Sequence, residues 1–288
     1  MLSRLTRMLP ARPLRAGPPL ADGHLFWPDA RLRLLSYNMQ AGMAIQAPHH
    51  FLTRGHRHVL PHGRRHEHLQ DIARLLASYD VVGLQEVDGG SLRSGYLHQL
   101  AHLAELAGFG WWYQQLNRDM GHFGQFSNGI LSRLAPYSAE AHALPGLRGR
   151  GVIATRYGSP GRELLVLNAH MALSERARLP QFGLLAELIG DAPHVVVMGD
   201  LNCTAAEWAR SALGKRRWGW LGEDMHTYPS WKPARQIDHI LVSEGLRVHS
   251  AAALDVVLSD HRPIAVEIEL PEALRQPAPL PVPVAAET

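Results

Sequence analysis

The feature that most constrains the fold is a series of short apolar runs, each about the length of a buried strand. Between residues 30 and 270 they read LRLLSYN, DVVGLQEV, NGILSRL, GVIATRY, RELLVLNAH, HVVVMGDLN, IDHILVS and IAVEIEL. Gly158, Ser159, Pro160 and Gly161 join two of these runs, and this turn composition predicts an antiparallel hairpin. The sequence therefore favours mixed strand pairing over a purely parallel sheet.

Helical patterns lie between several of the runs. Apolar residues recur at helical spacing over 69–76, over 97–106 up to Gly108, and over 182–189 up to Gly190. Strands that alternate with helices predict an α/β protein. At 288 residues the chain is long enough for one large domain.

Polar residues close many of the apolar runs, and this is the main indication of function. An unpaired charge inside a core costs several kcal/mol, whereas strand ends open onto loops where such groups can meet around one ligand. Each residue taken alone is more often a turn residue or a helix cap. The residues are Asn38, Glu86, Asn168, His170, Asp200, Asn202, Asp238, Asp260 and His261.

The order of these segments resembles one known family. The succession SYN, QEV, SR, NAH, GDLN, IDHI and SDHRP, over residues 31–269, is similar to the endonuclease/exonuclease/phosphatase family, of the DNase I-like superfamily of metal-dependent phosphoesterases. The resemblance implies a four-layer α/β sandwich, in which two mixed β-sheets pack face to face with flanking helices. It also implies hydrolysis of a phosphoester by in-line attack of water.

The resemblance assigns the metal site first. It implies that Glu86 is the principal Mg²⁺ ligand, with Asn38 and Asp260 as neighbouring ligands and Mn²⁺ as a possible substitute. Oxygen donors of this kind suit a hard divalent cation.

The remaining strand-end residues receive catalytic roles from the resemblance. Asp200 and Asn202 are expected to handle the attacking water and the phosphate. Asp238 and His261 form an expected pair in which the carboxylate orients the imidazole, and either Asp200 or His261 activates the water. His170 is expected to face the phosphate and to assist the leaving group, and the branch of the family that repairs abasic sites carries a different residue there.

Four further residues receive weaker interpretations. Asn168 is expected either to contact substrate beside His170 or to be a hydrogen-bonded strand residue. Ser132 and Arg133 are expected to support the site or to buttress a loop. His239 should face away from Asp238 across its strand, which favours a structural role.

Two clusters outside these motifs remain open. Residues 49–68 hold seven histidines interleaved with arginines, which favours a solvated insertion over a metal site and could form a wall of the substrate cleft. Aromatic residues Trp111, Trp112, Tyr113, Phe123 and Phe126 could stack bases but more often belong to a core.

The ends of the chain differ in composition from its middle. We expect a basic, Pro-rich leader over 1–29, the catalytic domain over 30–271, and a flexible Pro- and Ala-rich tail over 272–288. The single cysteine, Cys203, excludes an internal disulfide, which fits a cytoplasmic location. The basic leader would also suit peripheral contact with a membrane.

The sequence leaves the substrate open. A net charge of +3 lends only modest support to a DNA or RNA nuclease, the alternative to a phosphodiesterase acting on a lipid or a small phosphodiester. A non-catalytic binding module with the same fold is a third alternative. The expected partners are a phosphoester substrate, with nucleic acid or a membrane surface possible, and no protein partner is predicted.

Overall fold

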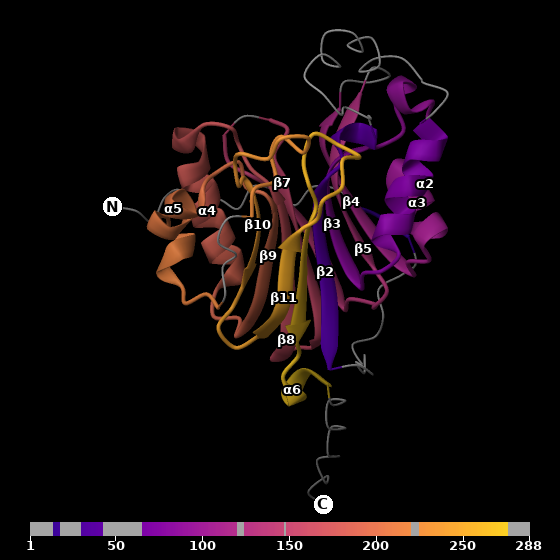
Figure 1. Ribbon diagram of the computed structural model, residues 1–288. Coiled ribbons are helices and arrows are strands. Elements are labelled where there is room, and N and C mark those ends of the chain that lie inside the picture. The colour runs from indigo at the N-terminus through magenta and orange to yellow at the C-terminus, as the bar shows by residue number, and fades with distance from the viewer. Residues whose placement is uncertain are drawn as a thin grey trace, which may run out of the picture.

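The computed structural model describes residues 14–17, 30–42, 65–119, 124–146, 148–219 and 225–275. Two sheets pack face to face, with helices on both outer faces (Figure 1). This is the four-layer α/β sandwich with mixed sheets that the sequence predicts.

The larger sheet has seven strands in the order β1-β4-β5-β3-β2-β12-β11. Strands β2 and β3 run parallel, and the other neighbours are antiparallel. Its strands are β1 (Leu14–Ala16), β2 (Arg31–Asn38), β3 (Val81–Asp88), β4 (Trp111–Asp119), β5 (Gln125–Ser132), β11 (Arg247–Ala253) and β12 (Ile264–Glu269).

The smaller sheet has five strands in the order β10-β9-β8-β7-β6. Strands β8 and β9 are parallel, and β7 and β8 form the antiparallel hairpin predicted around Pro160 and Gly161. Its strands are β6 (Ser138–Ala143), β7 (Gly151–Ser159), β8 (Arg162–His170), β9 (His194–Asp200) and β10 (Asp238–Val242).

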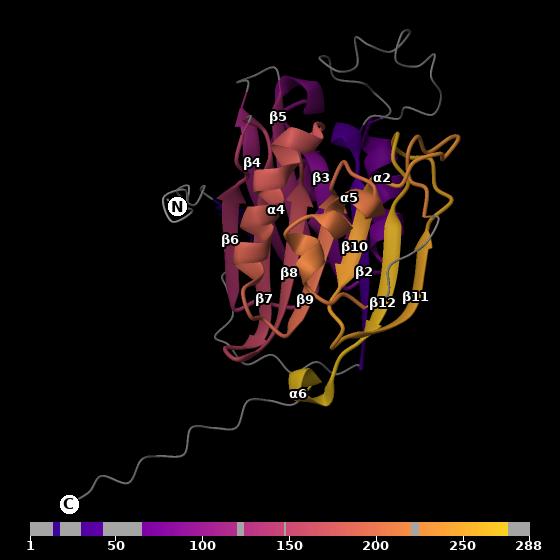
Figure 2. The same cartoon turned by 90° about the vertical axis from the view of Figure 1, so that its left-hand side faces the viewer.

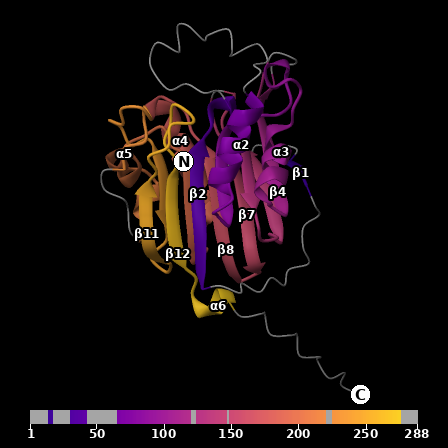
Figure 3. The same ribbon diagram turned by 45° about the vertical axis from the view of Figure 1, so that its right-hand side comes forward.

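The helices cover the outer faces of the sandwich. In Figures 2 and 3, α4 and α5 lie against the smaller sheet, while α2 and α3 lie against the larger one. Gly108, in the left-handed conformation at φ 72°, ends α3 at the position the sequence predicts. The helices are α2 (Arg65–Leu76), α3 (Gln99–Ala107), α4 (Glu175–Ile189), α5 (Ala205–Arg210) and α6 (Glu272–Arg275), with 3₁₀ turns η1 (Gln40–Gly42), η3 (Leu92–Ser94) and η5 (Leu213–Lys215).

Three apolar layers hold the sandwich together. The central layer joins the two sheets through residues such as Leu34, Ile130, Val166 and Met198, all completely buried. One outer layer packs α4 and α5 on the smaller sheet, and the other packs α2 and α3 on the larger sheet. The apolar faces predicted for the helices therefore pack against the sheets.

The domain boundaries differ from the expected ones at both ends. Within the expected leader, Leu14–Ala16 pairs with β4 as an edge strand, through Leu14 and Gln115 among others. Within the expected tail, Glu272–Arg275 is helical and Leu274 is buried. Both short segments are parts of the folded domain, because each is tied to it by pairing or burial.

A polar layer crosses the sandwich between the sheets. Gln85 donates to the side-chain oxygen of Asn168 at 2.6 Å, and Asn128 donates to the carbonyl of Gly151 at 2.8 Å. Gly151 permits this approach, because a Cβ there would lie 2.2 Å from the side-chain oxygen of Asn117. These hydrogen bonds fix the position of one sheet relative to the other.

Candidate active site

The candidate site lies at the end of the sandwich where the parallel strands of both sheets finish, the upper end in Figure 1. Asn38 closes β2, His170 closes β8 and Asp200 closes β9, and the register pairs His170 with Asp200. Asp238, the first residue of the antiparallel β10, also pairs with Asp200. The loop before β12 brings Asp260 and His261 to the same end, because β12 starts opposite Ser36 near the end of β2.

A β-bulge orients Glu86. The pairing of β3 with β5 shifts between Leu84 and Val87, and Glu86 has a left-handed backbone, with φ 56°. A bulge re-aims a side chain at the expense of a ladder hydrogen bond. Every other residue of β3 is buried, but the Glu86 side chain keeps 29% exposure and its Oε1 lies 3.9 Å from Nε2 of His170.

Asp200 accepts hydrogen bonds on both carboxylate oxygens. The amide nitrogen of Asn38 donates to Oδ2 at 3.1 Å, and the backbone N–H of Asn202 donates to Oδ1 at 3.0 Å. Burial and the neighbouring carboxylates of Asp238 and Glu86 raise the pKa of Asp200 to about 7, against those hydrogen bonds and the charge of His261. A carboxylate with this pKa can take up or release a proton near neutral pH.

His261 and Asp238 form a buried pair. Nδ1 of His261 lies 2.8 Å from Oδ2 of Asp238, which also accepts from the hydroxyl of Thr227 at 2.5 Å. Burial opposes a charge on His261, but the carboxylates of Asp238, Asp200 and Asp260 outweigh burial and raise the pKa of His261 to about 10. The imidazole is therefore cationic at neutral pH.

His170 has a defined tautomer. A guanidinium N–H of Arg150 lies 3.4 Å from its Nδ1, and since a guanidinium only donates, Nδ1 is the acceptor. Burial, with the positive charges of Arg150 and His261, lowers the pKa of His170 well below its ordinary value. The ring is therefore neutral and carries its proton on Nε2, which lies 3.5 Å from Oδ2 of Asp200.

Gln40 and Ser259 complete the hydrogen bonding around Asp260. The side-chain amide of Gln40 donates to one oxygen of Asp260 at 3.2 Å, and the hydroxyl of Ser259 lies 3.2 Å from the other. The same hydroxyl lies 2.8 Å from the carbonyl of Asn38, which it can reach as a donor. The loop that carries Asp260 is thereby tied to the end of β2.

Comparison with known proteins identifies the family. The model of the endonuclease/exonuclease/phosphatase family matches residues 35–261. The chain belongs to this family. Members of this family are phosphoester hydrolases and are typically metal-dependent, and the chain is an enzyme of the same class.

Other proteins are similar to the chain over most of its length. The chain is 29% identical over 233 residues to the protein YbhP of Escherichia coli, covering 70% of this chain and 87% of that protein. It shares its fold with a mannosyl-6-phosphatase of Bacteroides thetaiotaomicron (TM-score 0.62, 18% identity, 83% of this chain and 100% of the other). A humanized TDP2 of D. rerio is also similar (TM-score 0.57, 17% identity, 84% and 100%).

The structure brings together eight of the nine predicted strand-end residues, and Asn168 lies deeper. Its side chain is completely buried, and both amide hydrogens go to carbonyls, of Leu84 at 3.1 Å and of Gly129 at 2.8 Å. This geometry favours the second interpretation, a hydrogen-bonded strand residue. Asn202 lies at the site, but its amide donates to the carbonyl of Met171 at 3.0 Å.

The residues of the SR motif lie at the other end of the sandwich. Ser132 pairs with Val81, the first residue of β3. The guanidinium of Arg133 donates to the carbonyls of Ala77, Tyr79, Ala107 and Gly108, where α2 and α3 end. Arg133 therefore stabilises these helix ends, and the prediction that it supports the site is wrong.

The other sequence clusters have separate outcomes. His239 faces away from the site, with Nε2 2.7 Å from the carbonyl of Cys203, as a structural role requires. Tyr113 belongs to the core, while Phe126 lines a cavity beside Glu86. The histidine-rich segment lies outside the described residues as far as 64, and so does Phe123.

Sequence reasoning missed four residues of the site: Gln40, Arg150, Thr227 and Ser259. Ser259 and Gln40 stand within two residues of Asp260 and Asn38, so a search around each strand end could have found them. Arg150 and Thr227 act on His170 and Asp238 from loops distant in the sequence. No spacing pattern marks these two.

Two groups of residues could hold a cation. Donor atoms of Asp200, Asp238 and His261 lie within 4.8 Å of one another. These three side chains already form hydrogen bonds, either with one another or with Asn38 and Thr227. Glu86 and Asp260 form no ion pair with an Arg or Lys among the described residues, and the negative charge of Glu86 adds to burial in raising the pKa of Asp260. Neighbouring carboxylates without an Arg or Lys partner fit a divalent cation.

Among the described residues, the structure contains no helix with the length and apolar character needed to cross a membrane.

Proposed function

We propose that the chain is a Mg²⁺-dependent phosphodiesterase that acts on a small or lipid-borne phosphodiester through in-line attack of water. One observation carries the proposal. Carboxylate, amide and imidazole groups from β2, β3, β8, β9, β10 and the loop before β12 meet at one end of the sandwich, next to a cavity of about 450 Å³.

Glu86, Asn38 and Asp260 are the proposed ligands of the cation. Glu86 lines the cavity, and Asp260 is a second carboxylate that forms no ion pair with an Arg or Lys among the described residues. When bound, Mg²⁺ would neutralise charge on the phosphoryl oxygens. Mn²⁺ offers the same oxygen coordination and is the expected substitute.

Asp200 is the proposed acceptor of the proton from the attacking water. Its pKa of about 7 suits this role, since a base works best when its pKa lies near the working pH. The charge on His261 makes it a poor base at neutral pH. We assign His261 to stabilising negative charge on the phosphoryl group, with Asp238 holding its ring.

His170 is the proposed hydrogen-bond donor to the phosphate. Its neutral ring presents the Nε2 proton towards Glu86 and Asp200, where a phosphoryl oxygen of the substrate would accept it. In this position the Nε2–H stabilises developing charge on phosphate or leaving oxygen. Asn202 is the proposed second donor, once its amide turns from Met171.

The experiment measures turnover with Mg²⁺, with Mn²⁺ and with excess EDTA. The substrates are bis(p-nitrophenyl) phosphate, a short phospholipid, single- and double-stranded DNA, and RNA. We expect Glu86→Gln to reduce kcat/KM at least about 100-fold and His261→Ala to reduce kcat about 10²- to 10⁴-fold. Glu187→Gln, an exposed residue of α4, is the matched control.

Two results would redirect the proposal. Cleavage of nucleic acid alone would assign the chain to the nuclease alternative. Unchanged activity in both Glu86→Gln and His261→Ala, or no hydrolysis by the wild type of any substrate, would favour a non-catalytic binding module.

A further inference from the structure

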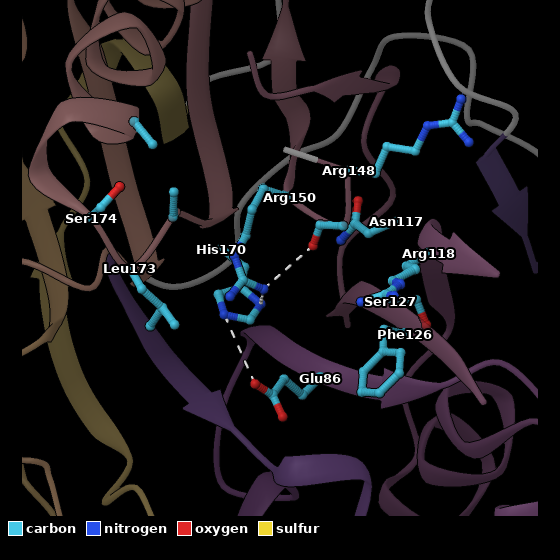
Figure 4. Close-up of a pocket in the computed structure, with 13 residues that line it drawn as sticks. Glu86, Asn117, Arg118, Phe126, Ser127, Arg148, Arg150, His170, Leu173 and Ser174 are labelled. Carbon is cyan, nitrogen blue, oxygen red and sulfur yellow. Dashed lines mark hydrogen bonds and ion pairs between the residues drawn. The ribbon is translucent and has the colours of Figure 1, made fainter. Parts of the chain in front are cut away.

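A cavity of about 450 Å³ opens beside the candidate active site (Figure 4). Glu86 and His170 form the side that faces the catalytic residues. The other walls come from β4 and β5, from the turn before β7, and from the connection between β8 and α4. They comprise Asn117, Arg118, Phe126, Ser127, Arg148, Gly149, Arg150, Ala172, Leu173, Ser174 and Ala177.

The cavity walls carry a surplus of positive charge. Arg118, Arg148 and Arg150 line the cavity, and Glu86 is its only carboxylate among the described residues. Arg118 and Arg148 form no ion pair with any described residue, and both side chains are exposed. In Figure 4 they lie on the far side of the cavity from Leu173 and Ser174. Their charge is thus available to a ligand that also reaches Glu86.

The start of α4 contributes to the same cavity. Ser174 is the N-cap of this 15-residue helix and its side chain makes no capping hydrogen bond. The N-terminus of a helix carries partial positive charge and free N–H groups, which favour an anion. The start of α4 therefore adds to the positive potential of the cavity from the side opposite the arginines.

The size of the cavity indicates how far the ligand extends. Ligand cavities of about 300–1,000 Å³ enclose small molecules, so this one holds more than a single phosphoryl group at Glu86. In Figure 4, Phe126 provides apolar surface beside Glu86 and Arg118, and the 75%-exposed Leu173 provides apolar surface across the cavity.

We propose that this cavity is a subsite for a second anionic group of the substrate, joined to the scissile phosphate by a short organic linker. Arg118 and Arg148 bind the second group, and Phe126 contacts the linker. The substrate class is thus a phosphodiester with a further phosphate, phosphonate or carboxylate on one of its alcohols. This inference rests on the proposed function, whose site supplies the first phosphate position.

Binding provides a test that does not depend on turnover. Calorimetry would compare propane-1,3-bisphosphonate with propylphosphonate in the presence of Mg²⁺. We expect the bisphosphonate to bind about 10- to 100-fold more tightly, the range for a charge-assisted hydrogen bond. Arg118→Gln combined with Arg148→Gln should abolish the preference, whereas Arg162→Gln, at the opposite end of β8 from His170, should retain it.

Kinetics provide the second test, with p-nitrophenyl propyl phosphate and the same ester bearing a terminal phosphonate. We expect the phosphonate to raise kcat/KM about tenfold or more through KM, and only in chains that keep Arg118 and Arg148. The source of the second anionic group is identified with a lipid substrate. In this lipid the phosphonate-bearing phosphodiester is attached to a dialkyl glycerol and presented in phosphatidylcholine vesicles. Faster turnover there assigns the subsite to a lipid headgroup, and slower turnover assigns it to a soluble substrate.

Equal binding of the two phosphonates by the wild type would overturn the inference. A preference for the bisphosphonate that persists when Arg118 and Arg148 are both replaced by Gln would also overturn it. So would a loss of activity in Arg118→Gln that is seen only with single-stranded DNA as substrate. Failure of the proposed function is a different result, because it appears as no hydrolysis of p-nitrophenyl propyl phosphate even though the bisphosphonate binds.

Discussion

The pair formed by His261 and Asp238 predicts a change in stability when one charge is removed. In Asp238→Asn the new amide oxygen can still accept from Nδ1 of His261 and from the hydroxyl of Thr227, which lie 2.8 and 2.5 Å from Oδ2. The substitution therefore keeps the shape of the pair. It removes the carboxylate charge that contributes most to holding a buried imidazolium.

The magnitude follows from the pKa of His261. A rise from 6.5 to about 10 corresponds to about 5 kcal/mol, at 1.36 kcal/mol per pKa unit. Asp200 and Asp260 contribute part of it, so we expect Asp238→Asn to lower the free energy of unfolding by about 2–4 kcal/mol at pH 6. Because the pKa is raised on folding, this stabilisation is full below pH 6.5 and is lost as the pH rises through 10.

The assay is urea unfolding of both proteins in EDTA, at pH 6 and at pH 10, with the imidazole titration followed by NMR. His261→Ala identifies the resonance among the 18 histidines of the chain. We expect the stability difference to shrink at pH 10 and the pKa of His261 to fall towards 6.5 in Asp238→Asn. A difference that is equal at both pH values, or a His261 that still titrates near 10 in the variant, would refute the reasoning.

Three further changes give separate predictions. Arg150→Gln removes the cation beside Nδ1 of His170, so kcat should fall about 10- to 100-fold and the ¹⁵N shifts of the ring should show mixed tautomers. Gly199→Ala places a Cβ 1.9 Å from a backbone carbonyl, at φ 141°. It should cost more than about 3 kcal/mol in urea unfolding, whereas Gly110→Ala, with nothing within 4 Å, should be nearly neutral. Folding raises the pKa of Asp200 to about 7, so in EDTA the wild type should lose stability relative to Asp200→Asn by about 2–4 kcal/mol between pH 5 and pH 8; an equal pH dependence in both proteins would contradict this.

Much of the fold could be predicted because burial on both faces leaves continuous apolar runs. All eight predicted runs correspond to strands, and the three predicted helices are present. Strands β1, β4, β6 and β11 were missed. Strand β11 is largely exposed, β6 contains mostly Ala and polar residues, and β4 has three aromatic residues followed by two glutamines. None of these strands has an apolar run of the length that marks the other eight, because partner strands rather than composition determine them.

The residues of the site could be predicted better than their contacts. A carboxylate at the end of an apolar strand is conspicuous in a sequence, and Glu86, Asp200 and Asp238 were found on that basis. Asn168 has the same signature, yet its amide hydrogen bonds hold the two sheets together. Asn168 and His170 lie on the same face of β8, two residues apart, so they differ in their depth along the strand. The sequence of a strand buried on both faces does not specify where the opposite sheet ends.

Sequence patterns do not predict the orientation of these side chains, because it depends on unusual backbone conformations. Gln40, Glu86 and Asn202 all have positive φ, at 44°, 56° and 52°. Each lies at or just after the end of a strand that contributes a residue to the site. A left-handed conformation costs a non-glycine residue about 1–2 kcal/mol, and such strain persists only where the surrounding structure enforces it. At Glu86 the bulge against β5 enforces it, and the side chain leaves the pleat to reach His170 of the other sheet. The convergence of the site thus depends on strained turns at the ends of regular strands, which the packing of two sheets stabilises and no local residue preference encodes.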